Sequence, residues 1–305
     1  MLARSPKKWA KPLATTLTVA SLCWLAWMLR AAWEAVGTRH GNLHWPVLFC
    51  SFLMLVFSLW LAFPAFLRML EAVVERRVPR AKVARLYFGS QMMKHLPGRF
   101  LGVAYQALSA PEVATPMQWA GVNVAYMILS LAGTVGVSVG ILTVYGLVSP
   151  WFLTSGVIAI LAACWGIRVA PAVSFGESSR WRRLLSSLVL TAKNLVNQRG
   201  ATGVLVWYTA SWLTYLAAWA LLGVGLDESA RVGIELCALY SLSWVVGFIA
   251  LVTPSGLGVR ELVFAMLASK YPPDLVVYVA VVARVWMLAA DILIGATHVL
   301  WKSYR

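Results

Sequence analysis

Two short stretches of the sequence put proline, glycine and positive charge inside otherwise apolar segments. One is Leu-Pro-Gly-Arg at 96–99, and the other is Pro-Ser-Gly-Leu-Gly-Val-Arg-Glu at 254–261. Proline lacks the backbone N–H that a helix interior needs, and glycine favours non-helical backbone, so both stretches should interrupt a helix. The residues predicted to form the two breaks are Pro97, Gly98, Pro254, Gly256 and Gly258.

Each break also carries cations, which are Lys94 and Arg99 in the first and Arg260 in the second. Non-helical backbone inside a membrane needs protein or a water-filled cavity around it. A half-helix that starts after a break presents free N–H groups to an anion, and arginine adds a fork that suits phosphate. The breaks therefore predict a hydrated site for an anionic, phosphate-bearing group. The alternative is a pair of kinked structural helices whose basic side chains reach the interface.

The last apolar segment carries Arg284, Asp291 and His298, spaced seven residues apart on one helical stripe. Ionisable residues inside a membrane are costly and usually face a bundle interior or a cavity. Seven residues rise about 10 Å along a helix, so Arg284 and Asp291 should find partners elsewhere. Arg260 and Glu261 are the candidates. Glu261 and Asp291 would either hold fixed ion pairs or carry protons, and both roles stay open.

The predicted substrate-binding residues share a position at or beside a break, or on the last apolar segment. They are Lys94, Arg99, Arg260, Glu261, Arg284 and Asp291. We expect no catalytic residue, metal or cofactor, because the four cysteines stand singly in apolar runs without a metal-ligand spacing.

The composition predicts an all-α, polytopic membrane protein. Of the 305 residues, 61% are hydrophobic and only 12% are charged, about half the charged share of a soluble domain. The net charge of +15 comes largely from clusters beside the apolar segments, which favours a membrane surface over nucleic acid as the partner. Tryptophans that flank apolar runs are expected to form an interfacial belt. They are Trp33, Trp45, Trp119, Trp151 and Trp301.

Apolar runs of membrane-spanning length predict where the chain crosses. They lie at about 13–33, 46–67, 118–144, 151–169, 201–223, 233–252 and 275–300. With the N-terminus in the cytoplasm, the basic stretches stay inside only if 86–110 dips into the membrane and leaves on the same side. A crossing at 253–270 would leave Lys302 and Arg305 in the cytoplasm, although re-entry there stays open. The expectation is about eight crossings with one or two re-entrant segments, in the inner membrane.

The two breaks divide the single transmembrane domain into halves of about 1–170 and 201–305, which suggests an inverted repeat. The joining segment, 171–200, has apolar residues on one helical face and basic ones opposite. It is predicted to be a cytoplasmic helix in the membrane interface, a connector between the halves, or both.

The two motifs resemble the signatures of the lysylphosphatidylglycerol synthase transmembrane-region family, also called flippase-like membrane proteins. The resemblance extends over essentially the whole chain in length and span pattern. It implies an inner-membrane protein of about eight helices that moves lipids or lipid-linked sugars, with Pro97, Arg99, Pro254, Arg260 and Glu261 among its motif positions. After Leu300 the chain has no room for a soluble aminoacyl-transferase domain, so synthesis of the lysyl-lipid is not expected of it.

Three functions follow as hypotheses. The first is translocation of an anionic lipid headgroup, either a phospholipid or a polyprenyl-phosphate-linked sugar, through a hydrated cavity. The second is an accessory subunit that holds a lipid synthase or glycosyltransferase at the membrane through 177–198. The third is a membrane enzyme acting on lipid-linked sugars, which the lack of paired carboxylates and of a nucleotide-binding loop disfavours. We expect the first, and therefore no enzyme.

Overall fold

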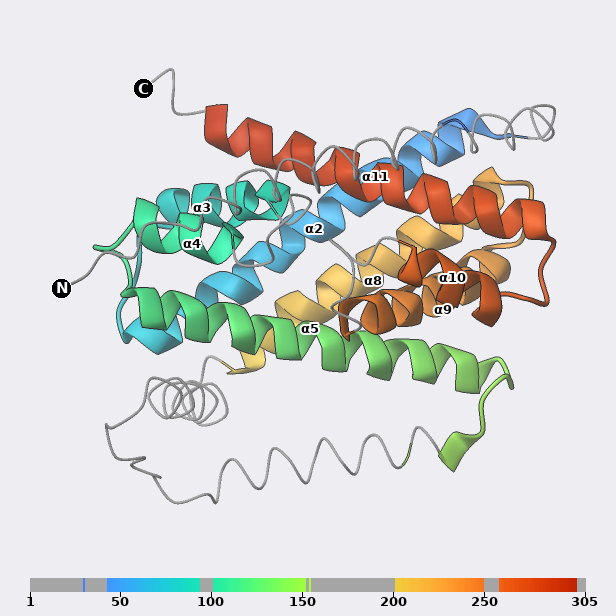
Figure 1. Ribbon diagram of the computed structural model, residues 1–305, viewed down its shortest axis with the longest axis horizontal. Coiled ribbons are helices and arrows are strands. Elements are labelled where there is room, and N and C mark those ends of the chain that lie inside the picture. Colours follow the sequence, from blue (N-terminus) through green and yellow to red (C-terminus); the bar gives the residue numbers. More distant parts are fainter. Residues whose placement is uncertain are drawn as a thin grey trace, which may run out of the picture.

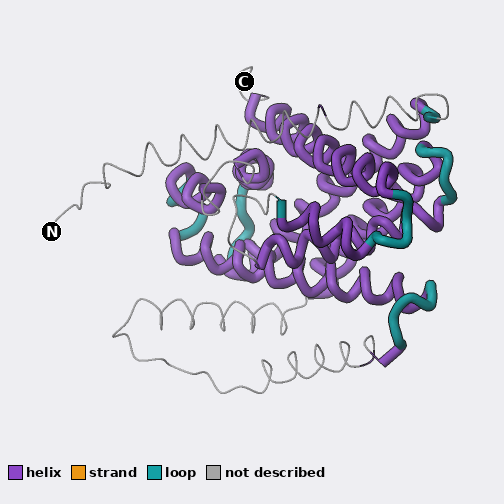
Figure 2. Tube along the Cα trace, turned by 45° about the vertical axis from the view of Figure 1, so that its right-hand side comes forward, coloured by secondary structure: helices purple, strands orange, loops and turns teal. Residues whose placement is uncertain are grey.

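Long apolar stretches form long helices in a computed structural model of the chain, which describes residues 30, 43–93, 101–151, 154, 201–249 and 258–300. The described residues form eight helices and no strand (Figure 1), and only helices and loops appear along the trace in Figure 2. Five of the helices are long and apolar enough to cross a membrane. These are α2 (Trp45–Val74), α5 (Pro116–Val144), α8 (Ala201–Gly225), α9 (Ala230–Ile249) and α11 (Pro273–Leu300). The shorter ones are α3 (Arg80–Met93), α4 (Leu101–Ser109) and α10 (Val259–Leu267).

The prediction of an all-helical membrane protein is confirmed at this level. The five long helices coincide with the predicted spans at 46–67, 118–144, 201–223, 233–252 and 275–300. The predicted span 13–33, nearly all of 151–169 and the amphipathic segment 171–200 lie outside the described residues.

Local sequence explains where two of the long helices begin. Pro116 and Pro273 occupy first-turn positions of α5 and α11, where a missing N–H costs nothing. At the start of α5, Thr115 accepts a hydrogen bond from the Gln118 backbone N–H, and the Gln118 side chain accepts one from the Thr115 N–H. This capping box satisfies two donors that a helix start leaves unpaired.

The helices α2 and α8 lie side by side and antiparallel through the middle of the bundle (Figure 1). The His44 N–H, before the start of α2, donates to the Gly225 carbonyl at the end of α8 over 3.0 Å. Further along, the Ser211 hydroxyl donates to the Ser58 carbonyl over 2.8 Å. Small hydroxyl side chains let these two backbones approach closely, as is common between membrane helices.

The short helices α3 and α4 form an antiparallel hairpin. A Cβ on Gly102 of α4 would lie 3.1 Å from the Ser90 carbonyl oxygen of α3, so the two backbones touch there. At the open end of the hairpin, Lys82 forms an ion pair with Glu112. This hydrogen-bonded pair lowers the pKa of the Glu112 carboxyl. The pair brings the two ends of the hairpin together, and the prediction that 86–110 re-enters the membrane stays a prediction.

A second antiparallel hairpin joins α9 and α10. The Tyr240 and Phe264 rings pack edge to face with centroids 5.2 Å apart, and the open end is closed by an ion pair between Glu235 and Lys270. The nine residues of α10 rise only about 14 Å, less than half of a bilayer's hydrocarbon core. Residues 258–270 therefore run back along α9. The helix within them, α10, is about half as long as a membrane span.

The two hairpins enter the bundle from opposite ends, as Figure 1 shows. The first follows the C-terminal end of α2 and the second follows the C-terminal end of α8, and those two helices are antiparallel. A long helix then leads away from each hairpin, α5 from the first and α11 from the second. α11 packs against α3, while α5 packs against α9, so each long helix also contacts the hairpin of the other half.

The prediction that Trp119 lies in an interfacial belt is wrong. Trp119 is fully buried, and its indole N–H donates to the Ala110 carbonyl over 3.4 Å. The loop at the open end of the first hairpin covers it, because Trp119 lies in the first turn and a half of α5. Trp45 and Trp151 are exposed, as an interfacial belt requires.

Two helix glycines give a test of the packing between α8 and α9. A Cβ on Gly233 would overlap the Trp219 carbonyl oxygen, whereas a Cβ on Gly136 would meet no atom within 4 Å among the described residues. We expect Gly233→Ala to lower the free energy of unfolding by about 1–3 kcal/mol through overpacking. Gly136→Ala should be neutral, or stabilising by up to about 1 kcal/mol. Thermal unfolding of both purified variants checks this, and equal melting temperatures would contradict the close approach.

Candidate functional site

Most of the predicted site residues that the structure describes lie beside the second break. Gly258, Arg260 and Glu261 begin α10, and Arg284 lies on α11 beside them. The predicted residues Lys94, Pro97, Gly98, Arg99, Pro254 and Gly256 lie outside the described residues.

The start of α10 depends on a glycine and a carboxylate. Gly258 has φ 82°, in the half of conformational space where a Cβ is strained, and α10 begins at the next residue. The Gly258 N–H donates to Glu261 Oε2 over 2.8 Å. A carboxylate in the first turn also interacts favourably with the positive end of the helix dipole. Gly258 and Glu261 together therefore set the direction in which α10 leaves the break.

Glu261 also holds Arg284. The other carboxylate oxygen of Glu261, Oε1, accepts a hydrogen bond from the Arg284 guanidinium, and both side chains are largely buried, 16% and 14% exposed. This pair confirms the prediction that Arg284 finds its partner at Glu261 and not at Asp291. Because Glu261 is engaged on both oxygens, the geometry favours the fixed ion pair among the two roles that the sequence left open.

Arg260 is the cation of this site that no carboxylate neutralises among the residues that the structure describes. Its guanidinium carbon lies 3.9 Å from the centre of the Tyr240 ring, a cation–π contact, and its backbone packs against Gly247. Among the described residues, no ion pair or hydrogen bond holds the guanidinium, and its buried Nε has no partner. Glu261 and Arg284 cancel, so these three residues keep a net charge of +1.

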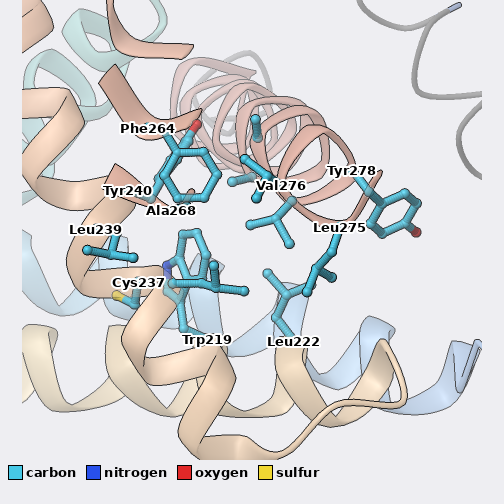
Figure 3. Close-up of a cluster of buried hydrophobic side chains, with 14 of the residues drawn as sticks. Trp219, Leu222, Cys237, Leu239, Tyr240, Phe264, Ala268, Leu275, Val276 and Tyr278 are labelled. Atoms are coloured by element: carbon cyan, nitrogen blue, oxygen red, sulfur yellow. The ribbon is translucent and has the colours of Figure 1, made fainter. Parts of the chain in front are cut away.

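A hydroxyl without a partner lies at the same place. The buried Tyr240 hydroxyl has no hydrogen-bond partner among the described residues, and it is within electrostatic reach of Arg260, Glu261 and Arg284. Its ring belongs to the apolar cluster beneath the second hairpin, together with Trp219 and Phe264 (Figure 3). Buried polar groups normally have partners, so an orphan hydroxyl beside an unneutralised cation favours water or an anion at this point.

Asp291 lies at the other break. It is 2% exposed and lines a small cavity between α2, α3 and α11, with Tyr87, Gln91 and Ile294 among the other lining residues. Gln91 comes three residues before Lys94, at the end of α3. The predicted site residues therefore form two groups, joined by α11. Arg284 reaches the flank of the second break, and Asp291, about 10 Å further along the helix, borders the flank of the first.

Sequence reasoning missed a neutral polar network in the first hairpin. Gln106 is completely buried, donates to the Ser90 hydroxyl over 3.0 Å and accepts from the Asn123 amide over 2.7 Å. An amide in each of two apolar segments was the available signal, since a buried amide needs partners. Tyr240 could not be recognised in this way. It contacts Arg260 between two helices, α9 and α10, and the sequence pattern does not show which residues of two helices meet.

His298 is the third residue of the seven-residue stripe on α11. In the structure it is half buried between α3 and α11, with its ring centroid 4.3 Å from that of Phe88. Its Nδ1 lies 2.9 Å from the Ile294 carbonyl oxygen.

Comparisons of the chain with protein-family models, with curated proteins and with solved structures found no match. The resemblance to the flippase-like family therefore rests on the two motifs and on the length and span pattern of the chain.

The ion pair predicts a non-additive response to mutation. Glu261→Gln leaves an acceptor for the Gly258 N–H but strands the Arg284 charge, so we expect it to lower the free energy of unfolding by about 3 kcal/mol. Adding Arg284→Gln should restore most of that loss, because the double variant buries no unpaired charge there. Thermal or denaturant unfolding of the two single variants and the double variant measures the coupling. Additive losses would show that the pair is not formed.

Proposed function

We propose that the protein translocates an anionic lipid headgroup across the inner membrane, as a flippase or scramblase. The supporting observation is Arg260, an arginine at the start of a helix next to a break, held over the Tyr240 ring and neutralised by no carboxylate among the described residues. An uncompensated charge inside a membrane is costly, and intramembrane charges mark substrate pathways. A negatively charged headgroup would supply the missing partner.

The arrangement of the helices supports an inverted repeat. In each half a long helix, a hairpin with a nine-residue second arm and another long helix follow one another, α2 to α5 and α8 to α11. In such a repeat α3 corresponds to α9, and α5 corresponds to α11. The contact between α3 and α11 then corresponds to the contact between α9 and α5, and both contacts are present. The antiparallel α2 and α8 give the halves opposite directions. Transporters built from inverted repeats bind substrate where the repeats meet, at broken helices.

Charge at the two ends of the bundle supports an orientation. The end with the first hairpin carries six basic residues on or beside α2 and α3 against three acidic ones. They are Arg68, Arg76, Arg77, Arg80, Lys82 and Arg85, against Glu71, Glu75 and Glu112. At the other end, the described residues in and around the α8–α9 and α10–α11 connections include four carboxylates, Asp227, Glu228, Glu235 and Asp274, and two lysine or arginine residues, Arg231 and Lys270. The positive-inside rule then puts the first hairpin on the cytoplasmic side, and with a span at 13–33 the N-terminus is cytoplasmic too.

The translocation pathway would lie along α11 between the two breaks. The headgroup's negative charge would meet Lys94 and Arg99 at the first break and Arg260 at the second, while the acyl or prenyl chains stay in the lipid. Tyr240 keeps the Arg260 guanidinium in place without neutralising it, because a ring face attracts a cation but takes up no charge. Glu261 and Arg284 would form the rigid side of the site.

Reconstitution into liposomes tests the proposal. The wild-type protein should carry fluorescent phosphatidylglycerol, or a polyprenyl-phosphate sugar, across the bilayer faster than protein-free liposomes do. Arg260→Gln should slow this movement at least about tenfold, since one lost charge-assisted contact of 1.5–3 kcal/mol corresponds to roughly a factor of 10 to 100. Arg260→Lys should retain part of the rate.

Arg231→Gln is the matched control. Arg231 also stacks on a tyrosine, with its guanidinium carbon 4.7 Å from the centre of the Tyr145 ring, but it lies at the end of the bundle, outside the site. Its variant should translocate lipid like the wild type. Equal rates for Arg260→Gln and the wild type, or no lipid movement by the wild type, would refute the proposed function.

A further inference from the structure

The cavity beside Asp291 has features that the headgroup site does not use. It lies between three helices at the flank of the first break, and its polar lining comes from Asp291, Gln91 and Tyr87. Its free space suits about one water molecule, far less than a lipid headgroup needs. The cavity therefore suits a very small ligand.

His298 lies near the cavity, at the C-terminal end of α11. His298 lies one helical turn beyond Ile294, which lines the cavity. Its Nδ1 is 2.9 Å from the Ile294 carbonyl oxygen, and a carbonyl only accepts, so Nδ1 carries the hydrogen. In the neutral ring, Nε2 is then the basic nitrogen.

Hydroxyl groups continue from the cavity towards α5. The Tyr87 and Tyr126 hydroxyl oxygens lie 3.2 Å apart, and Tyr87 is within electrostatic reach of Asp291. Among the described residues, Tyr87 is thus the titratable group within electrostatic reach of Asp291, Tyr126 follows it, and His298 lies about two turns further along α11. From α2, Leu59 lines the cavity without a titratable group.

We propose that Asp291 and its cavity form a proton-binding site inside the membrane. In the forward step the Asp291 carboxylate takes a proton from a hydronium ion in the cavity, and a water molecule stays behind. The reverse step restores the charges. Intramembrane carboxylates mark proton and ion pathways in transporters, and this one lies on the same helix as Arg284.

A metal cation fits the cavity less well than a proton. Sodium, like other hard cations, requires several oxygen ligands at fixed distances, and the polar lining offers three side chains, of which only Asp291 is anionic. The residues that the structure describes also contain no group of three His, Cys, Asp or Glu side chains placed to hold a metal.

The site would give the proposed translocation a driving force. Protonation removes the negative charge at the first break, and α11 connects that point to the Glu261–Arg284 pair at the second. A proton gradient could then bias the binding of the headgroup. This consequence rests on the proposed function, whereas the proton site itself does not.

Infrared difference spectra of the full-length protein in lipid nanodiscs, recorded between alkaline and acidic buffer, test the site without any lipid transport. The wild type should show the C=O stretch of a buried carboxyl group that becomes protonated, and Asp291→Asn should lose it. The matched control is Glu112→Gln, which removes an exposed carboxylate from a loop and should keep the buried band. Asp291→Glu and Tyr87→Phe should keep the band at a shifted frequency, so a folding failure of Asp291→Asn leaves the test intact.

Three results would overturn the inference. They are an unchanged buried band in Asp291→Asn, no shift of the band in Tyr87→Phe and Asp291→Glu, or a spectral change produced by sodium at constant pH. Because the readout is spectroscopic, a protein that moves no lipid but shows the band would refute the proposed function alone. A protein that moves lipid without the band would refute the proton site alone.

Discussion

A peptide group or a charge that meets hydrocarbon without a partner costs several kcal/mol, and this cost governs how the chain interrupts its helices. The second break is flanked by Gly258, whose N–H is bonded to Glu261, and Glu261 in turn is bonded to Arg284. One carboxylate thus satisfies the helix start and an arginine together. What it does not satisfy is Arg260, and the proposed function follows from that remaining charge.

The hairpins bring the described flanks of these breaks into the bundle. Each short arm returns along the helix before it, and an ion pair closes the open end, Lys82 with Glu112 in the first and Glu235 with Lys270 in the second. The order of charges is reversed between the two, so the hairpins share a shape and not a sequence. The packing at their contacts relies on small residues, Gly102 in one and Gly247 in the other. Close backbone contact lets a nine-residue helix stay attached without a long apolar face.

The helix α11 connects the two breaks, and it carries a different kind of charge at each. Arg284 is held in a fixed pair near the second break, and Asp291 borders a water-sized cavity near the first. Both residues lie on the helical stripe that their spacing of seven residues predicted. The spacing could not predict that the stripe contacts both hairpins, because α3 and α11 meet only when the two halves pack together.

The sequence by itself determined the helical class, the five helices of membrane-spanning length that the structure describes, and Glu261 as a candidate partner of Arg284. These depend on apolar length and the cost of a lone buried charge, both of which are local or compositional. Only the tertiary structure decided that Trp119 is covered, that Arg260 stacks on Tyr240, and that Asp291 lies beside Tyr87. Those contacts join residues of different helices, and the antiparallel packing of α2 with α8 sets which helix faces which.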